Sequence, residues 1–329
     1  MKEKRSKMVG KRELLHRFPT IEQSLYEQAE QLFPIRITRS WLLRENSPVG
    51  PLVKQALPDG AELEKYKEDH LDPVGEESLS PHPWLIQKYS NRILFITTRR
   101  CHLYCRYCFR RNHTGAEDPT REELESAIAY INQKNIQECI LSGGDPLAIS
   151  SSRLSLLLSS ISSPVIRIHT RAPITEPSVV RSSLLDILKK RSGLWMIVHC
   201  NHPKELSPEV IAGLRAIQEC GIPLLNQAVL LKGVNDSVDV LEELCNRLVS
   251  LQIFPYYLHH TDAAQGNAHF RVSLNKGISI YQELRKRVSG IALPRYVIDP
   301  PTGEGKIDVE RFIQQNPWAF KSEKEQNML

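Results

Sequence analysis

The stretch CHLYCRYC places three cysteines within eight residues, at Cys101, Cys105 and Cys108. In a chain without a disulfide framework, such a cluster more often binds metal or carries out chemistry. A structural zinc site uses four ligands, and the fourth would have to be His102, His113 or a distant cysteine. Three thiolates also suit a [4Fe–4S] cluster, which then has one iron without a protein ligand, open to a small molecule. The other cysteines are isolated and are interpreted as buried small hydrophobic residues: Cys139, Cys200, Cys220 and Cys245.

From residue 93 onward, short apolar runs recur about 30 residues apart, which is the length of one βαβ unit. These runs are interpreted as buried strands: ILFITT (93–98), ECILSG (138–143), VIRIHT (165–170), LWMIVHC (194–200), PLLNQAVLL (223–231) and FPYYLHH (254–260). Segments with helical spacing separate them, and PTREELESAIAYINQ (119–133) begins with a capping box from Thr120 to Glu123. Six such units in a row predict a parallel sheet with helices outside it.

Polar residues stand at the C-terminal end of every predicted strand, where the active sites of barrels gather. After the cysteines come SGGDP (142–146), HTR (169–171), HCNH (199–202), NQ (226–227) and HHTD (259–262). A ring explains this distribution better than an open sheet, so we predict an α/β fold with an incomplete, TIM-like barrel of six βα units. A flavodoxin-like sheet is the alternative, but it would concentrate polar groups at one switch point. The predicted parts are an N-terminal helical extension wrapping the core (1–88), the partial barrel (89–292) and a C-terminal segment (293–329).

Composition narrows the range of functions. Hydrophobic residues make up 41% and charged residues 25% of the 329 residues, as in an ordinary soluble globular protein. The formal net charge of +5 is spread along the chain without a basic stripe, so we expect no nucleic-acid partner. No apolar run is long enough to span a membrane, and the basic N-terminus lacks the apolar segment of a secretory signal. We therefore expect a cytoplasmic protein without a membrane partner.

The cysteine motif follows the first strand of the βα series and has Tyr107 just before its last cysteine, which resembles the signature of radical S-adenosylmethionine enzymes. The resemblance implies that the three cysteines hold a [4Fe–4S] cluster whose open iron binds the amino and carboxylate groups of S-adenosylmethionine. Reduction, by a donor such as flavodoxin or ferredoxin, then releases a 5′-deoxyadenosyl radical. Tyr107 is implied to lie against the adenine. The other implied S-adenosylmethionine contacts are Ser142, Gly143, Gly144, Asp145, His199 and Gln227.

A longer resemblance, from about Leu32 to Asp308, is to the lysine 2,3-aminomutase family and its short relatives that supply β-lysine for modifying elongation factor P. The matching stretches are LFPIRIT, DPVGEE, YCRYCFRR, LSGGDPL, NHP, LLNQAVLLKGVND and PYYLHHTD. The family members are isomerases that convert L-α-lysine to β-lysine, and they use pyridoxal phosphate (PLP) in addition to S-adenosylmethionine. The resemblance therefore implies lysine as the substrate, with its migrating amino group carried on PLP.

Two segments supply the PLP site that the resemblance implies. DPPTGEGKID resembles the glycine-rich lysine segment of the family, which makes Lys306 the residue that holds PLP as a Schiff base. The predicted C-terminal segment would thus carry the PLP lysine. KYSNR matches the phosphate-binding segment of the family and implies Lys88, Tyr89 and Arg92 as contacts of the phosphate.

The substrate lysine needs groups of opposite charge at its two ends. Arg110 matches the arginine of the family that pairs with the substrate α-carboxylate, and its bidentate fork suits that role. Asp262 and Asp299 match the two acids that hold the ε-ammonium group. Two inward-facing carboxylates would be costly to bury without a cation, so together they imply a cationic ligand.

The sequence also departs from the long members of the family. Their zinc-binding cysteine after the VND segment is Ser237 here, and their cysteine-containing C-terminal extension has no counterpart in the sequence. An oligomer is compatible with the sequence but does not follow from the long members. Two other functions stay open: a radical mutase for glutamate or ornithine, and a zinc-stabilised nucleic-acid-binding protein. Retention of both Asp262 and Asp299 favours lysine over the first of these alternatives.

Overall fold

The computed structural model describes residues 8–45, 47–301 and 304–316. Its centre is a sheet whose described strands neighbour one another in chain order, from β1 to β9. The strands are β1 (Leu85–Tyr89), β2 (Arg92–Thr98), β3 (Glu138–Gly143), β4 (Val165–Thr170), β5 (Leu194–His199), β6 (Leu224–Val229), β7 (Phe254–His259), β8 (Arg295–Ile298) and β9 (Ile307–Asp308). Strands β2 to β8 are parallel neighbours, whereas β1 and β9 pair antiparallel at the two edges. Because the order ends at these edges instead of closing, the sheet is a partial barrel, which confirms the predicted fold class.

The six predicted strands are all present, and β3 and β4 coincide with ECILSG and VIRIHT. Helix α5 (Arg121–Gln133) begins at the predicted capping box, in which the Glu123 N–H donates to Thr120 Oγ1 at 3.2 Å and the Thr120 N–H donates to Glu123 Oε2 at 2.7 Å. The sheet is wider than predicted, because β8 adds a seventh parallel strand and β1 and β9 add antiparallel edges. The run RYVI of β8 is too short for its pattern to distinguish a strand from a loop.

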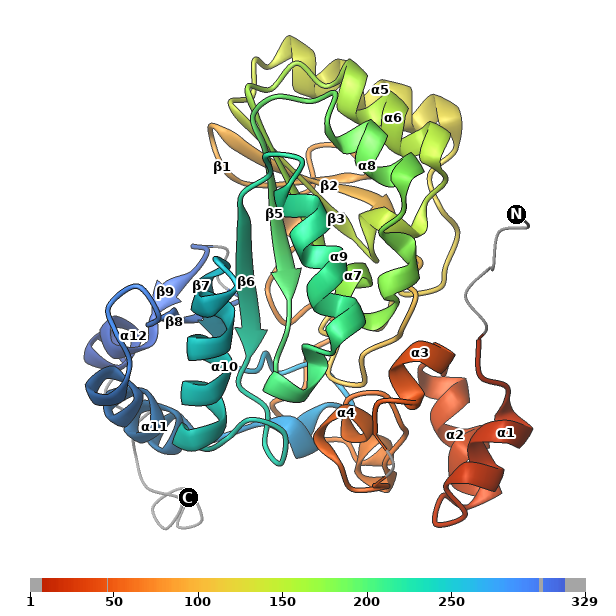
Figure 1. The fold of residues 1–329 in the computed structure, drawn as a ribbon, viewed down its shortest axis with the longest axis vertical. Helices are drawn as coiled ribbons and strands as arrows, with labels where there is room; N and C mark the ends of the chain where they lie inside the picture. Colours follow the sequence, from red (N-terminus) through yellow and green to blue (C-terminus); the bar gives the residue numbers. More distant parts are fainter. Residues whose placement is uncertain (1–7, 46, 302–303, 317–329) are drawn as a thin grey trace.

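Helices cover the outer face of the sheet, as crossover connections between parallel strands require (Figure 1). After α5 they are α6 (Ser151–Ser160), α7 (Ala172–Thr175), α8 (Ser182–Leu188), α9 (Pro208–Gln218), α10 (Val238–Ser250), α11 (Leu274–Arg287) and α12 (Val309–Gln315). Short 3-10 turns span Gly60–Leu63, Glu77–Leu79, Pro146–Ala148, Pro177–Val179, Pro203–Glu205 and Ala268–Phe270. Apolar residues of the strands and helices form the main core, in which Ile166 and Ile168 of β4 and Leu154 and Leu157 of α6 are buried.

The inner face of the barrel is polar by contrast. On β4, Ile166 and Ile168 are buried, whereas Arg167 and His169 alternate with them and are partly exposed. Because successive side chains of a strand point to opposite faces, Arg167 and His169 face the barrel interior. The interior thus carries charged and imidazole groups that a bound ligand could contact.

Four helices precede the sheet and lie on the side toward which the arrowheads of β5 and β6 point: α1 (Lys11–Arg17), α2 (Gln23–Leu32), α3 (Arg39–Leu42) and α4 (Pro51–Lys54). Backbone hydrogen bonds join this part to the cysteine loop, since the Arg106 N–H donates to Gln55 O and the Tyr104 N–H donates to Arg36 O, each at 2.9 Å. The N-terminal helices therefore support the end of the barrel where the candidate residues lie. Among the described residues, we find no helix with the length and apolar character needed to cross a membrane.

Candidate active site

The cysteine loop follows β2 and brings the three predicted cluster ligands close together. Burial, followed by the neighbouring Asp145, Cys108 and Cys105, raises the pKa of Cys101 well above its ordinary value. Burial and then Cys105 raise the pKa of Cys108 to about 11. The Cys108 N–H donates to Cys105 O at 2.9 Å, so these two cysteines share one turn.

Three adjacent thiols form a donor set that suits a [4Fe–4S] cluster, in which each thiolate binds a different iron. The sulfur atoms of such a set surround the cluster and need not converge on one point. Within the described ranges, no three His, Cys, Asp or Glu side chains come close enough together to hold a single metal ion.

Arg171, directly after β4, connects Cys105 to a buried polar network. Its NH1 group donates to Cys105 Sγ at 2.8 Å, and its NH2 group donates to Gln55 Oε1 at 2.6 Å and to Glu205 Oε2 at 3.0 Å. A positive charge beside a metal-binding sulfur complements the thiolate, which is the form that binds iron. The HTR segment marks this strand end as polar, but nothing in the sequence distinguishes Arg171 from a surface arginine.

The glycine-rich segment after β3 packs against the chain that leads into the cysteine loop. Gly143 has a left-handed φ of 114°, and a Cβ on it would lie 2.4 Å from Thr98 O. A Cβ on Gly144 would lie 2.4 Å from Arg100 O. Only glycine therefore fits these two positions, because the ends of two neighbouring strands meet there without space for a side chain.

Two further residues predicted to contact S-adenosylmethionine already have protein partners. Asp145 Oδ2 accepts the N–H groups of Arg171 and Ala172, each at 2.8 Å, and thereby joins the end of β3 to the end of β4. Ser142 Oγ accepts an N–H of Arg110 at 3.2 Å. The structure places the whole SGGD segment beside the cysteine loop, and its contact with S-adenosylmethionine stays a prediction.

Tyr107 of the cysteine loop lies beside His199 at the end of β5, and Gln227 is on the neighbouring strand β6. The Tyr107 hydroxyl accepts an N–H of Asn201 at 2.7 Å and lies 3.4 Å from His199 Nε2, and its ring packs edge-on against Phe270. Gln227 is paired in register with His199 on the neighbouring strand. Tyr107 is buried, and its contact with the adenine of S-adenosylmethionine stays a prediction.

At another part of the barrel mouth, two lysines share one carboxylate. Lys88 Nζ donates to Asp299 Oδ1 at 2.9 Å and to Val74 O at 2.8 Å, whereas Lys306 Nζ lies 3.4 Å from Asp299 Oδ2. The Lys88 side chain is 11% exposed and the Lys306 side chain is 36% exposed. Lys306 is thus the more accessible amine, as a lysine that reacts with PLP must be. Lys88 is paired with Asp299, an acid predicted to contact the substrate, and its contact with the phosphate stays a prediction.

Of the remaining phosphate candidates, Tyr89 packs against the residue that precedes the candidate PLP lysine, and Arg92 packs on Tyr89. Gly305 has a left-handed φ of 83°, and a Cβ on it would lie 1.9 Å from the Tyr89 hydroxyl. The Arg92 guanidinium lies 4.1 Å from the centre of the Tyr89 ring. Arg92 and Arg167 both pair with Glu138, at 3.6 and 2.6 Å, yet the Nε atom of each is buried without a hydrogen-bond partner in the described structure. Two guanidinium groups around one carboxylate leave positive charge and open donors, which fit a phosphate group.

Asp262, in the loop after β7, lies near the same lysines and near Asp299. Burial, followed by Asp299, raises the pKa of Asp262 to about 7, while Lys306 acts in the opposite direction. A carboxyl group in this state would be stabilised as the carboxylate by an additional cation. The structure thus brings together the two acids that the sequence nominates for the substrate ammonium.

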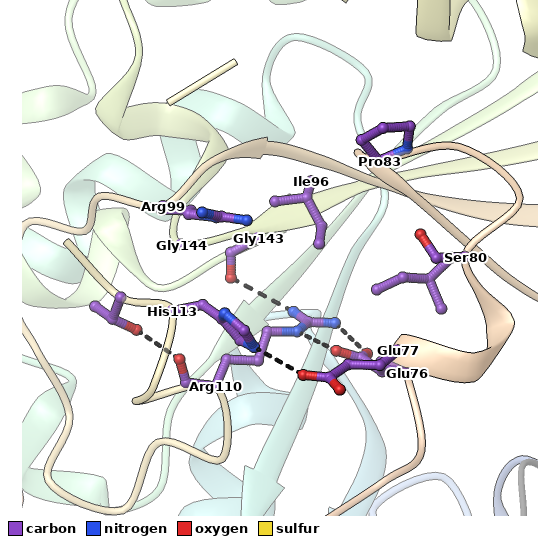
Figure 2. A pocket seen from close by; sticks show the side chains of 12 residues that line it. Glu76, Glu77, Ser80, Pro83, Ile96, Arg99, Arg110, His113, Gly143 and Gly144 are labelled. Carbon is purple, nitrogen blue, oxygen red and sulfur yellow. Dashed lines mark hydrogen bonds and ion pairs between the residues drawn. The ribbon is translucent and has the colours of Figure 1, made fainter. Parts of the chain in front are cut away.

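Arg110, two residues after Cys108, is held by a carboxylate that the sequence analysis did not nominate. Its Nε and NH2 groups donate to the two carboxylate oxygens of Glu76 at 2.7 and 2.5 Å (Figure 2). Burial opposes the charge of Arg110, but Glu76 outweighs this effect and raises the pKa of Arg110, with smaller contributions from Cys108 and Asp299. Arg110 is therefore close both to the cysteine loop and to the acids.

Two histidines of the barrel interior, His169 on β4 and His259 on β7, are further candidates. Burial, followed by Lys306, lowers the pKa of His259 to about 3, and burial, followed by Arg167, lowers the pKa of His169 well below its ordinary value. Both are therefore neutral imidazoles, and His169 Nε2 is buried without a partner in the described structure. Their inward positions in the strand alternation are the sequence signal that could have identified them.

A cavity of about 130 Å³ opens beside Arg110 (Figure 2). It lies between the cysteine loop, the glycine-rich segment and the first two strands. The residues that line it are Glu76, Glu77, Ser80, Pro83, Ile86, Ile96, Arg99, Arg110, His113, Thr114, Gly143 and Gly144.

Comparison with known proteins then establishes the family. Residues 95–245 match the model of the Radical SAM superfamily. The L-lysine 2,3-aminomutases of Clostridium subterminale and Bacillus subtilis (strain 168) are each 38% identical to this chain, over 82% and 86% of its length. The L-lysine 2,3-aminomutase of Buchnera aphidicola is 37% identical over 85% of each chain. This chain belongs to the lysine 2,3-aminomutase family.

This member of the lysine 2,3-aminomutase family spans 66% and 63% of the length of the Clostridium and Bacillus relatives. Among solved structures, a radical SAM methyltransferase from Sphaerobacter thermophilus matches with a TM-score of 0.47 and 21% identity, over 65% of this chain and 68% of that one. Membership of the family implies a [4Fe–4S] cluster, S-adenosylmethionine and PLP as cofactors. The three adjacent thiols fit the cluster, and the exposed amine of Lys306 with the open donors of Arg92 and Arg167 fits PLP.

Proposed function

We propose that the protein is an isomerase that converts L-α-lysine to β-lysine by migration of the amino group from carbon 2 to carbon 3. The observation that carries the proposal is the set of charged groups at the barrel mouth, where Asp262 and Asp299 lie with Lys306 and where Arg110 lies near them. Lysine carries a carboxylate at one end and an ammonium group at the other, so a guanidinium and a pair of carboxylates complement it. The relatives named L-lysine 2,3-aminomutase support the same substrate.

In the proposed complex, Arg110 binds the α-carboxylate and the two acids bind the ε-ammonium group. The pKa of about 7 for Asp262 supports this arrangement, because the cations already near this carboxyl group do not fully compensate for its burial and for Asp299. A ligand ammonium group would provide the missing charge. A second carboxylate, as in glutamate, would be repelled at the same position, which favours lysine over glutamate.

The cofactors would supply the radical chemistry, with the cluster and S-adenosylmethionine generating a 5′-deoxyadenosyl radical and PLP carrying the migrating amino group. The chain would hold them in place through Cys101, Cys105 and Cys108 for the cluster and Lys306 for PLP. Phosphate contacts would come from Lys88, Tyr89 and Arg92, and S-adenosylmethionine contacts from Tyr107, Ser142, Gly143, Gly144, Asp145, His199 and Gln227.

The partners proposed for this activity are lysine and a one-electron donor of the flavodoxin or ferredoxin class, which would reduce the cluster. Use of the β-lysine for modifying elongation factor P stays a prediction, as does a cytoplasmic location. Assembly into an oligomer is compatible with the proposal and is not required by it.

An anaerobic assay tests the proposed activity. Protein reconstituted with iron and sulfide would be incubated with lysine, PLP, S-adenosylmethionine and a strong reductant, and the products would be separated by chromatography. β-Lysine should form only when every component is present, and parallel reactions with glutamate and ornithine should give little product. Turnover of glutamate in preference to lysine, or purified protein with stoichiometric zinc and no iron, would refute the proposal.

A further inference from the structure

The turn formed by residues 72–77 connects the N-terminal helices to the sheet and is fixed at several points. Both carboxylate oxygens of Asp72 accept backbone N–H groups of the last two residues of the turn, each at 2.9 Å. Gly75 has a left-handed φ of 66°, and a Cβ on it would lie 2.5 Å from Pro301 O. The turn therefore packs directly against the segment that follows Asp299.

His70, two positions before this turn, forms backbone hydrogen bonds with the loop that carries Asp262. The His70 N–H donates to Ala263 O at 2.9 Å, and the Gln265 N–H donates to His70 O at 3.3 Å. These bonds lie directly after Asp262 in the chain. Lys88 Nζ also donates a hydrogen bond to Val74 O at 2.8 Å. The segment 70–77 therefore contacts three parts of the proposed site: the segment after Asp299, the loop after Asp262, and Lys88.

Glu76 projects from this fixed turn onto one edge of the Arg110 guanidinium (Figure 2). It engages the side edge, formed by Nε and NH2, at 2.7 and 2.5 Å. At the end edge, formed by NH1 and NH2, the contacts within the described part of the chain are longer and run from NH1 to Ser142 Oγ at 3.2 Å and to Gly143 O at 3.4 Å. The two side chains are 16% and 15% exposed, so little water competes with the pair.

We propose that Glu76 is a positioning residue that fixes the side edge of Arg110 and thereby presents its end edge to the α-carboxylate of the substrate. This inference rests on the proposed function, in which Arg110 binds that carboxylate. A substrate that displaced Glu76 would leave a largely buried carboxylate without its cation, which is costly. Binding at the end edge keeps both carboxylates on the guanidinium, which has five N–H donors in a planar fork.

The variant Glu76→Gln tests the inference, because glutamine keeps the shape and one acceptor oxygen of the side chain but removes its charge. The neighbouring Glu77→Gln is the matched control, since the Glu77 side chain is 71% exposed and lies 3.6 Å from His113. Binding would be measured without S-adenosylmethionine, as the change in absorbance of the iron-loaded, PLP-loaded protein on addition of ligand. The two ligands are lysine and lysine amide, which lacks the carboxylate.

We expect the dissociation constant of lysine to rise about tenfold in Glu76→Gln, the effect of loosening one charge-assisted contact. The dissociation constant of lysine amide should change less than about twofold in the same variant, since lysine amide makes no bond to Arg110 through a carboxylate. Glu77→Gln should change the dissociation constant of neither ligand. A merely structural role of Glu76 would weaken both ligands alike. Glu76→Asp, which keeps the charge but shortens the side chain, should give a smaller loss that is again confined to lysine, and it provides the test if Glu76→Gln does not fold.

Unchanged or tighter binding of lysine to Glu76→Gln, or equal losses for lysine and lysine amide, would overturn the role of Glu76. Wild-type protein that binds lysine no more tightly than lysine amide would overturn the proposed function of Arg110, on which the inference rests. The two failures are distinguishable, because the second is seen in the wild-type protein alone.

Discussion

Replacing Asp262 with asparagine tests the ammonium end of the proposed site, because burial and the neighbouring Asp299 raise the pKa of Asp262 to about 7. With that pKa, roughly one tenth of the free protein is ionised at Asp262 near pH 6 and roughly nine tenths near pH 8. Only the ionised form attracts an ammonium group. Lysine binding to the wild-type protein should therefore tighten about tenfold between these pH values.

The measurement compares lysine with norleucine, which has the same chain length but no ε-ammonium group. Reaction of the α-amino group with PLP also depends on pH, and the ratio of the two dissociation constants removes this shared dependence. The ratio should change about tenfold in wild-type protein between about pH 6 and pH 8, and it should be nearly constant in Asp262→Asn. At pH 8 the variant should bind lysine at least about tenfold more weakly than wild type, as expected for removal of one partner of a buried charged pair.

The same pKa also predicts the direction of a change in stability. The folded protein binds a proton at Asp262 that the unfolded chain, with an ordinary pKa of 3.8, releases at lower pH, so the free energy of unfolding falls as pH rises from about 4 to about 7. The difference between a pKa of 3.8 in the unfolded chain and about 7 in the folded protein corresponds to at most about 4 kcal/mol, an upper bound because solvent reaches part of the Asp262 side chain. Asp262→Asn without lysine should thus resist denaturant better than wild type at pH 8, and the two should converge near pH 4.

Two results would refute this reasoning. The first is a lysine-to-norleucine ratio in wild-type protein that does not change across the pH interval, which would show that Asp262 has an ordinary pKa or does not contact the ammonium group. The second is an Asp262→Asn variant with the lysine affinity of wild type, which would remove the ground for placing the ε-ammonium group at this acid. Iron content should be unchanged in the variant and serves as the control for correct folding.

The other predictions concern the cofactor residues. Alanine at any one of Cys101, Cys105 or Cys108 should abolish both iron binding and turnover, measured by iron analysis and by the lysine assay, and full activity of the triple variant would exclude the assigned cluster. Lys306→Ala should retain iron but lose the covalent label that PLP and borohydride leave on the protein; one dominant label at another site would identify a different lysine. Gly305→Val should weaken PLP binding in an absorbance titration, because a Cβ at this position would lie 1.9 Å from the Tyr89 hydroxyl. An unchanged affinity for PLP would contradict this packing.

Features that depend on neighbours along the chain could be predicted from the sequence. The capping box from Thr120 to Glu123 forms as expected, because both of its hydrogen bonds lie within one helical turn. The six apolar runs become parallel strands, since a run of buried residues followed by a helix leaves few other arrangements. The placement of Cys101, Cys105 and Cys108 after the first of these strands also follows from the order of the chain.

Contacts between segments that are distant in the chain were decided by the tertiary structure alone. Glu76 and Arg110, which form a bidentate ion pair, are 34 residues apart in the chain, and the paired Lys88 and Asp299 are 211 residues apart. No local sequence pattern indicates that either pair is in contact. Glu76 has no role in the sequence analysis, which also does not indicate that Lys88 pairs with Asp299.

The same limit applies to the electrostatics of the site. The residue type of Asp262 gives an ordinary carboxyl pKa, whereas its value of about 7 arises from burial and from Asp299 across the barrel mouth. The sequence by itself determined the βα framework, because periodicity and capping are properties of the chain read in order, and its resemblance to known proteins indicated the family and nominated the candidate residues. Which carboxylate holds which cation was decided only by the folded barrel, because burial and charge pairing depend on distances in space between groups that the sequence does not bring together.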